Sequence, residues 1–354
     1  MITAADFKVT KAERSRLKDV NLENVPFGKY FTDHMLEVDF ADGEWKTVEI
    51  KPYQALTLGP SAAALHYGQA IFEGIKAYKS ADGKAAIFRP LDNFKRFNIS
   101  AKRMQMPEVP EEIFMEGMRL LLQLDSDWIP ARANHSLYIR PFMFSSDEML
   151  GVRPGHNFKF MIILSPTGPY YGKPMKIWVE EHYVRAVKGG VGFAKAAGNY
   201  AAAMYATEEA RKNGFDQVLW TDPIEHRYVQ ECGVMNVFFI IDNKAITPGL
   251  EQGTILAGVT RNSVITLLNE MGITVEERDL SIDEIIAAHK AGTLQEVFGT
   301  GTAATISEIK ELCYKDYSML FDVEKWKVSP AIKNRLDTIR YMEGPDTHHW
   351  MYYI

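Results

Sequence analysis

The sequence predicts a mixed α/β protein, of the α+β type in its first half, that is divided into two domains. The chain has 354 residues, a length typical of about two domains. Two Asp-Gly steps between alternating apolar runs in the first half indicate hairpins of an antiparallel sheet. The Pro- and Gly-rich segment "SPTGPYYGKP" then separates two strand-like runs. We therefore expect a smaller N-terminal α+β domain at 1–168, a linker at 169–175 and a larger, β-rich C-terminal domain at 176–354.

The first half alternates hairpins and helices. "HMLEVDF" and "WKTVEI" flank the turn "ADGE", and "GIKAYKS" and "AAIFRP" flank "ADGK" in the same way. Apolar residues at helical spacing predict helices over 91–104 and 110–124, the second of which begins with a Pro. We expect a helix or a turn at 65–74, and strands at 136–144 and 158–166.

The second half contains a longer alternation of strands and helices. The clearest helix runs from Ser281 to Gly292, where Ser281 and Glu284 have the spacing of a capping box and Gly292 marks the end. Further helices are expected at 200–213, ending before Gly214, and at 260–272. Strands are expected at 175–181, 216–220, 234–241, 273–280 and 294–298, and the last of these leads into a Gly-rich turn.

Composition excludes several classes of protein. Hydrophobic residues make up 46% and charged residues 24%, which is typical of a globular protein rather than a disordered one. A net charge of -6 gives no general attraction to nucleic acid or anionic lipid, so small molecules are the expected partners. No run approaches the roughly 20 apolar residues of a membrane span, and the polar start lacks a secretory signal. We expect a cytoplasmic protein without membrane association.

The cysteines and histidines do not suggest a metal site. Cys232 and Cys313 are far apart and form no C-x-x-C pair, so neither a disulfide framework nor a zinc cluster is predicted. The pair His348 and His349 lacks a third histidine at ligand spacing, and surface placement is the simpler explanation. We expect no metal.

Lys195 is a candidate nucleophile. Lys195 stands among glycines and alanines in "GGVGFAKAAGNYAAAMY". An ammonium that loses water without gaining a partner tends to lose its proton, and the neutral amine attacks carbonyls. A lysine on a flexible surface loop is the ordinary alternative, so other residues must decide.

Two segments of the second half are candidates for binding an anion. "ILAGVTRN" places Gly258, Val259 and Thr260 at the start of a helix, where free N–H groups and the helix dipole favour an anion. "FGTGTAA" offers backbone donors at Gly301, Thr302 and Ala303 in a tight turn. An ordinary helix start and an ordinary strand end are the alternatives.

The turn "GTGTAA" also matches G-x-G-x-x-A, the fingerprint of a dinucleotide site. Such a site must begin a long amphipathic helix, whereas "TISEIKELCYKDY" alternates like a strand. We therefore expect no nicotinamide cofactor, although a dehydrogenase stays among the alternatives.

Three charged residues complete the candidates. Glu231 precedes an apolar strand, where it is either a solvated carboxylate or an acid that holds a cofactor's ring nitrogen protonated. Arg140 lies inside an apolar strand, where a guanidinium needs a carboxylate or a cleft. Arg96 falls on a predicted helix, for which a solvated face is the default explanation.

Together these motifs resemble the branched-chain amino acid aminotransferases of the pyridoxal-phosphate fold type IV group. The resemblance covers nearly the whole chain and is carried by "FGKYFTDHML", "LHYGQAIFEGIKAY", "SLYIRPF", "GGVGFAKAAGNY", "QVLW", "ECGVMNVF", "EVFGTGTAA" and "HHWMYYI". It implies pyridoxal 5'-phosphate bound between the small N-terminal domain and the large cofactor-binding domain. It also implies a homodimer and amino transfer between leucine, isoleucine or valine and 2-oxoglutarate, which yields glutamate.

The resemblance implies a role for each matching position. Lys195 corresponds to the Schiff-base lysine, Tyr200 to the partner of the cofactor's phenolic oxygen, and Glu231 to the acid on the pyridine nitrogen. The phosphate-binding positions are Arg96, Val259, Thr260 and Thr302. The substrate-binding positions are Phe27, Tyr67, Phe72, Tyr138, Arg140, Tyr170, Thr302 and Ala303, together with Leu150 and Val152 on a loop that reaches the neighbouring subunit's site.

The sequence departs from the family at two places. Val234 stands where many relatives carry Thr, so one hydroxyl near the substrate carboxylate is missing. Ala304 and Ser307 stand where the mammalian enzymes carry a redox-active cysteine pair, so thiol regulation of that kind is not expected. A D-amino acid aminotransferase, an aminodeoxychorismate lyase and a non-catalytic binding protein stay as alternatives, and the order of preference among the three branched-chain substrates stays open.

Overall fold

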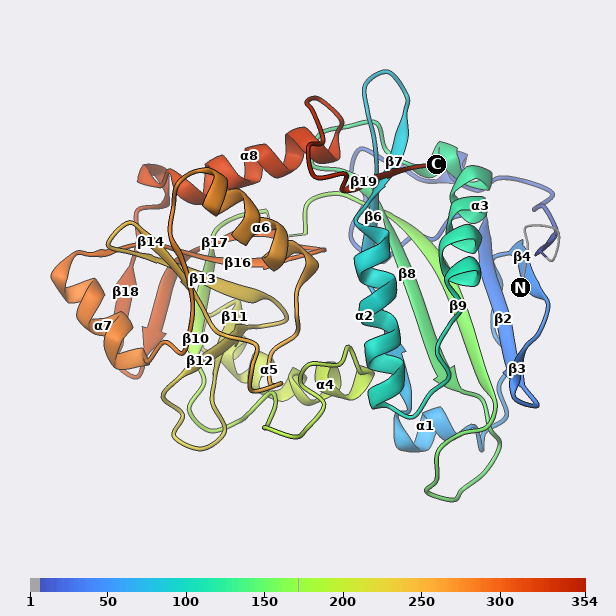
Figure 1. Cartoon of the computed structure of the whole chain (residues 1–354), viewed down its shortest axis with the longest axis horizontal. Helices are drawn as coiled ribbons and strands as arrows, with labels where there is room; N and C mark the ends of the chain where they lie inside the picture. Colours follow the sequence, from blue (N-terminus) through green and yellow to red (C-terminus); the bar gives the residue numbers. More distant parts are fainter. Residues whose placement is uncertain (1–6, 171) are drawn as a thin grey trace. The chain divides into compact units, whose positions relative to one another are not determined.

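The computed structural model describes residues 7–170 and 172–354, which form two compact units (Figure 1). Unit 1 contains 7–170 together with 194–198 and 338–354, and unit 2 contains 172–193 and 199–337. The border falls inside the predicted linker, of which Tyr171 lies outside the described residues. The segments 194–198 and 338–354, assigned from sequence to the C-terminal domain, belong instead to unit 1.

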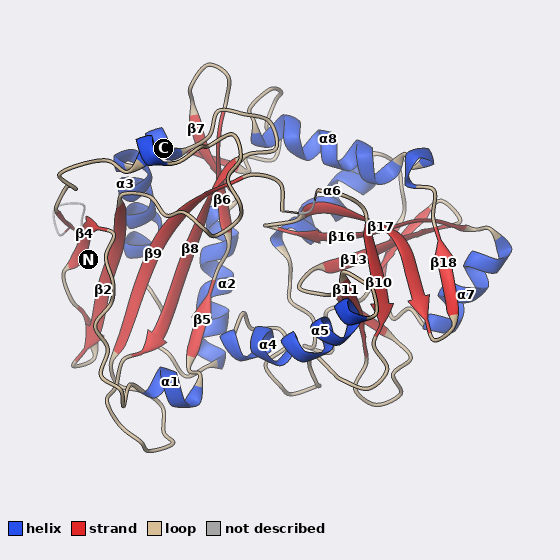
Figure 2. Ribbon diagram, turned by 180° about the vertical axis from the view of Figure 1, so that it is seen from behind, coloured by secondary structure: helices blue, strands red, loops and turns tan. Residues whose placement is uncertain are grey.

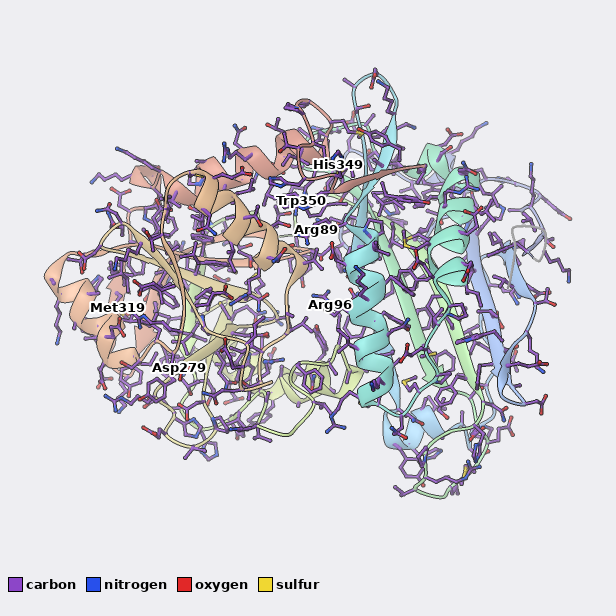
Figure 3. All side chains as sticks on the ribbon, viewed as in Figure 1. Arg89, Arg96, Asp279, Met319, His349 and Trp350 are labelled. Carbon is purple, nitrogen blue, oxygen red and sulfur yellow. The ribbon has the colours of Figure 1, made fainter. Side chains whose placement is uncertain are left out.

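The segment 338–354 belongs to unit 1 because it pairs with strand β7 and packs on its end. Strand β19 (Met351–Tyr353) runs antiparallel to β7 (Ala85–Phe88), with Met351 opposite Phe88. The Arg89 N–H donates to the Trp350 carbonyl at 2.7 Å, and the Arg89 guanidinium lies 5.0 Å from the centre of the Trp350 ring (Figure 3). The last residues of the chain therefore close one edge of the first sheet.

Unit 1 is built on a sheet with the strand order β1-β4-β2-β9-β8-β6-β7-β19, in which β3 pairs with β2 and β5 with β8. Its pairs run antiparallel as predicted, except for the parallel pair of β1 and β4. In the first hairpin Asp42 and Gly43 adopt φ of 55° and 79°, the backbone that a two-residue hairpin turn requires. The other strands of this sheet are β1 (Phe7–Val9), β2 (His34–Ala41), β3 (Glu44–Trp45), β4 (Val48–Pro52), β5 (Ala70–Phe72), β6 (Ile75–Lys79), β8 (Ser136–Ser145) and β9 (Phe158–Thr167).

The helices of unit 1 follow the predicted apolar spacing. Helix α2 (Pro90–Arg103) confirms the first prediction, and the second predicted helix begins with the π-helical turn η3 (Glu112–Glu116) before α3 (Gly117–Leu124). Segment 65–74 combines the end of α1 (Ala63–Tyr67) with β5, so the expectation of a helix or a turn is wrong for Phe72. The short 3-10 turns are η2 (Leu17–Asp19) and η4 (Ser126–Trp128).

The two faces of this sheet differ in character. Helices α2 and α3 cover one face, where Phe97 and Leu121 pack with Leu137 and Ile139 in the buried core (Figure 2). Since successive side chains of a strand point to opposite faces, Tyr138 and Arg140 point away from these helices. Phe72 shares their face because β5 pairs with β8 through Phe72 and Phe142. The face away from the helices thus carries several of the predicted substrate residues.

Unit 2 is built on a mixed sheet with the order β12-β11-β10-β17-β16-β13-β14-β15, in which β18 pairs with β17. Strand β10 runs parallel to both β11 and β17, and β14 runs parallel to β15. Leu219, Val237, Val297 and Leu312 are fully buried in its core. The strands are β10 (Met175–Val179), β11 (Gln217–Thr221), β12 (Val229–Cys232), β13 (Asn236–Ile241), β14 (Lys244–Thr247), β15 (Val275–Glu277), β16 (Leu294–Gly301), β17 (Thr305–Tyr314) and β18 (Tyr317–Leu320).

The helices of the second half agree with their sequence signals. The Ser281 hydroxyl accepts the Glu284 N–H at 3.1 Å, and Gly292 ends the helix with φ 73°, as the capping box predicts. The predicted helix 200–213 is interrupted at Ala203. In the described part of the chain no helix has the length and apolar character needed to cross a membrane. The helical segments are α4 (Ala197–Ala202), α5 (Met204–Lys212), α6 (Val259–Glu270), α7 (Ile282–Ala291), η5 (Val323–Lys325) and α8 (Val328–Arg340).

Candidate active site

The backbone of Lys195 is hydrogen-bonded to two elements of unit 1. Its N–H donates to the Ser100 hydroxyl on α2 at 2.9 Å, and its carbonyl accepts the Phe72 N–H at 3.1 Å. The next residue, Ala196, forms a β-bridge with Ile71. Lys195 is half-buried, so it does not lie on a flexible surface loop, which was the ordinary alternative. These hydrogen bonds fix the backbone position from which the Lys195 side chain extends.

Six of the predicted site residues of unit 1 form one continuous row of contacts. The Lys195 Nζ lies 4.9 Å from the centre of the Phe72 ring, and the Arg140 guanidinium lies 4.6 Å from the same ring. Arg140 also donates to the Tyr138 hydroxyl at 3.1 Å. Phe27 packs edge-on against both Tyr138 and Tyr170, each at 4.9 Å between ring centres. The row therefore places aromatic rings, one guanidinium and one amine side by side.

Gly74 makes room for the hydroxyl in this row. A Cβ at this position would lie 2.1 Å from the Tyr138 Oη, far inside van der Waals contact. Only a residue without a side chain therefore lets the Tyr138 hydroxyl reach its place beside Arg140.

Arg96 is buried and forms an ion pair, so a solvated helix face, the default explanation, is wrong. Its Nε and Nη2 donate to the two Glu73 carboxylate oxygens at 2.7 Å and 2.8 Å. Burial alone would raise the pKa of Glu73, but the charge and hydrogen bonds of Arg96 outweigh it. The charge of Lys195 and a hydrogen bond from Asn93 act in the same direction, so this pKa lies below its ordinary value.

Glu231 lies in unit 2 at the end of β12 and is also buried. One carboxylate oxygen accepts the Leu256 N–H at 2.8 Å, and the other lies 3.2 Å from the Arg185 Nε. Arg185 in turn donates to the Gly192 carbonyl at 3.2 Å and to the Thr254 carbonyl. The solvated strand-end carboxylate is thus wrong, and Glu231 is held as an acceptor by the loop that precedes α6.

The first turn of α6 has the features of an anion site. Val259 and Thr260 begin the helix, and no side chain in the described part of the chain caps it at Gly258. A Cβ on Gly258 would lie 2.0 Å from the Asn236 Oδ1, so glycine permits the close approach of Asn236 to the start of the helix. Thr300 lies opposite Asn236 in the sheet, and its hydroxyl is buried without a hydrogen-bond partner in the residues described. Free N–H groups and a hydroxyl of this kind suit a phosphate.

The Gly-rich turn does not begin a helix. Thr302 and Ala303 lie between β16 and β17, which pair antiparallel with Gly299 opposite Ser307. A dinucleotide fingerprint needs a strand followed by a helix, so the fold excludes this kind of site here.

The remaining predicted residues lie on other elements. Tyr67 on α1 is 42% exposed, and Leu150 and Val152 are 70% and 88% exposed on the loop between β8 and β9. Tyr200 lies on α4, and 199–337 belong to unit 2. The structure thus brings together one set of residues in unit 1 and a second set in unit 2.

Sequence reasoning missed the charged partners of Arg96 and Glu231. Glu73 stands in the quoted motif "LHYGQAIFEG" as an acid within an apolar run, a signal that was available. Arg185 lies in the loop 180–196 with no distinguishing pattern, and it is far in sequence from Glu231. Ser100 looks in sequence like any helical serine.

Comparison with known proteins identifies the family of this chain. Residues 70–312 match the family model described as amino-transferase class IV. The chain belongs to the class IV aminotransferase family. The resemblance found in the sequence is therefore confirmed at the level of the family.

The relatives of this aminotransferase are similar over most of its length. A Staphylococcus epidermidis protein named "Probable branched-chain-amino-acid aminotransferase" is 48% identical over 350 residues, which is 97% of each chain. The "Branched-chain-amino-acid transaminase 1" of Bacillus subtilis is 52% identical over 291 residues, which is 81% of this chain and 82% of the other.

Solved structures agree with the predicted fold type. The Escherichia coli branched-chain amino acid aminotransferase has a TM-score of 0.74 at 27% identity and covers 90% of this chain and 99% of its own. The T.th. branched-chain amino acid aminotransferase, complexed with N-(5'-phosphopyridoxyl)-L-glutamate, has a TM-score of 0.72 at 27% identity, over 90% and 98%. These neighbours confirm the fold type IV prediction for this aminotransferase.

The close approach of Asn236 to Gly258, at the start of α6, gives a prediction. Gly258→Ala places a Cβ 2.0 Å from the Asn236 Oδ1, so either the first turn of α6 or the Asn236 side chain, which is hydrogen-bonded to the Leu256 carbonyl, must shift. We expect a loss of roughly 1–3 kcal/mol in the free energy of unfolding, measured by urea titration. Gly172→Ala is the control, because its Cβ would meet nothing within 4 Å, and it should change stability by less than about 0.5 kcal/mol. Equal stabilities of the two variants would contradict the account of this turn.

Proposed function

We propose that this aminotransferase transfers the amino group of L-leucine, L-isoleucine or L-valine to 2-oxoglutarate, with pyridoxal 5'-phosphate carried on Lys195. The names of the relatives support the substrate class, since proteins about half identical over most of the chain are named for branched-chain amino acids. The phosphopyridoxyl-glutamate in the complex of the T.th. enzyme supports the cofactor and a glutamate-type substrate.

The observation that carries the proposal is the row from Lys195 to Tyr170. Its aromatic rings form an apolar surface that suits an aliphatic side chain. Arg140 is hydrogen-bonded to Tyr138 but has no carboxylate partner among the described residues. Its guanidinium is therefore available for the second carboxylate of glutamate or 2-oxoglutarate. One surface serves two chemically different substrates in this way.

Residues of both units suit the cofactor. The uncapped first turn of α6, with Val259 and Thr260, offers N–H donors for the phosphate, and Thr302 and Arg96 add a hydroxyl and a charge. Glu231 is a fixed carboxylate that would hold a proton on the ring nitrogen, and Tyr200 would donate to the phenolic oxygen. When bound, pyridoxal 5'-phosphate supplies the conjugated ring that accepts the electrons released at the substrate Cα.

Lys195 performs the proton transfer. With the cofactor bound, its Nζ would take the proton from the substrate Cα as general base and would give it up again as general acid. The hydrogen bonds to Ser100 and Phe72 keep its backbone in place during both steps. Thr302 and Ala303 donate to the substrate α-carboxylate, where Val234 contributes no hydroxyl.

We include a homodimer in the proposal. Leu150, Val152 and Tyr67 are exposed apolar or aromatic side chains, of the kind that a second copy covers. In the dimer Leu150 and Val152 reach the substrate pocket of the neighbouring subunit.

The proposed reaction is tested by glutamate formation. Purified protein loaded with pyridoxal 5'-phosphate should make glutamate from L-leucine and 2-oxoglutarate, and Lys195→Ala should reduce this rate at least ~100-fold. Lys188→Ala, an exposed lysine of the same loop, should retain the rate of the unmodified protein. Activity with D-alanine but not with L-leucine, or release of pyruvate from aminodeoxychorismate, would assign another reaction of this fold.

Arg140 separates the two substrates. Arg140→Met keeps the bulk and removes the charge, so kcat/KM for glutamate should fall roughly 10- to 100-fold, the effect of one lost charged hydrogen bond. The value for leucine should stay within a few-fold, measured as single-turnover half-reactions. Arg119→Met, which removes the partner of Glu116 on a partly exposed surface, is the control. Equal losses with both donors would show that Arg140 acts on the fold instead.

A further inference from the structure

Glu73 is a buried carboxylate to which the proposed reaction assigns no role. It follows β5 directly, and its side chain is 0% exposed. One oxygen accepts the Arg96 Nε at 2.7 Å. The other accepts the Arg96 Nη2 and the Asn93 Nδ2, each at 2.8 Å, and the Gly74 N–H at 3.0 Å. A carboxylate with this many donors is ionised and fixed in one orientation.

This arrangement determines the direction of Arg96. A guanidinium is planar and rigid, so holding Nε and Nη2 fixes the plane of the group. The pair therefore also fixes which way the other edge of the guanidinium faces. The hydroxyl of Ser100 donates to the Arg96 carbonyl at 3.1 Å and accepts the Lys195 N–H, so the same turn of α2 holds both residues.

Glu73 also supplies a negative charge close to Lys195. Both residues are neighbours of Phe72. Glu73 follows Phe72 in sequence, and the Lys195 carbonyl accepts the Phe72 N–H. The buried charged side chains of the neighbouring elements α2 and β6 are the cations Arg96 and Lys76, and β8 adds the half-buried Arg140. The acid of α2, Asp92, is paired with Arg89. The charge of Lys195 contributes to the lowered pKa of Glu73, so the two groups interact.

We propose that Glu73 is a positioning residue that directs Arg96 toward the cofactor phosphate and provides the fixed negative charge beside the Lys195 nitrogen. This inference rests on the proposed function. It predicts two separate effects, one on cofactor affinity through Arg96 and one on the proton affinity of the Lys195 nitrogen.

The test uses Glu73→Gln, which keeps the shape and removes the charge. The dissociation constant for pyridoxal 5'-phosphate should rise roughly tenfold or more, because Arg96 loses its charged partner. A negative charge favours the protonated nitrogen, so its removal should move the pH midpoint of the bound cofactor's absorbance change lower by roughly one unit. In an Arg96→Lys background the same substitution should change the affinity by less than about threefold, since the two residues act together.

Two further variants keep the test decisive. Glu73→Asp retains the charge but shortens the side chain, so the pH midpoint should stay near that of the unmodified protein while the affinity falls. It also provides the comparison if the Gln variant does not fold. Glu37→Gln is the matched control, because Glu37 is a partly buried acid of the same sheet that pairs with Lys51 and Lys159. It should change neither cofactor affinity nor pH midpoint.

The outcomes distinguish this inference from the proposed function. If the unmodified protein binds the cofactor and transaminates leucine, but Glu73→Gln leaves both affinity and pH midpoint unchanged, the role of Glu73 is wrong while the reaction stands. A shift of the same size in Glu37→Gln would likewise overturn it. If the unmodified protein binds no cofactor, the proposed function itself fails.

Discussion

The position of Lys195 depends on two backbone hydrogen bonds, and the proposed chemistry depends on that position. Ser100 on α2 and Phe72 on β5 hold the N–H and the carbonyl of Lys195. Both elements are part of the sheet-and-helix core of unit 1, so the backbone of Lys195 has a rigid support. The chain on either side of 194–198, at 193 and at 199, belongs to unit 2. Residues on strands and helices hold catalytic groups more closely than loops do. The short segment 194–198 therefore obtains its order from its neighbours.

The charges of unit 1 are arranged in two different ways. Arg96 is neutralised by the buried Glu73, which accepts from it in a bidentate manner. Among the described residues, the polar and ring contacts of the Arg140 guanidinium are one tyrosine hydroxyl and two aromatic rings. A guanidinium cannot lose its proton, so burial without a carboxylate is costly unless a ligand provides one. The arrangement of Arg96, paired with Glu73, suits a permanent cofactor. The second arrangement, that of Arg140, suits a substrate that binds and leaves in each reaction cycle. Glycine at position 74 makes the second possible, because it admits the Tyr138 hydroxyl.

Most of the fold follows from local signals, whereas the ion pairs of the site do not. The Asp-Gly turn at Asp42, the cap at Ser281 and the strand at 136–144 each depend on neighbouring residues, and the structure confirms all three. The pairs Glu73–Arg96 and Arg185–Glu231 join residues far apart in sequence, and the composition around them is ordinary. A single sequence records no such pairing. The site residues were found through resemblance to a family, and their assigned roles stay predictions.

The most direct test of the central claim is to locate the cofactor on the chain. The protein loaded with pyridoxal 5'-phosphate is reduced with borohydride, digested and mapped by mass spectrometry. We expect the added mass on the peptide that contains "GGVGFAK", retained in Lys188→Arg and lost in Lys195→Arg. A label on another lysine, or an unlabelled chain after incubation with excess cofactor, would contradict the assignment of Lys195.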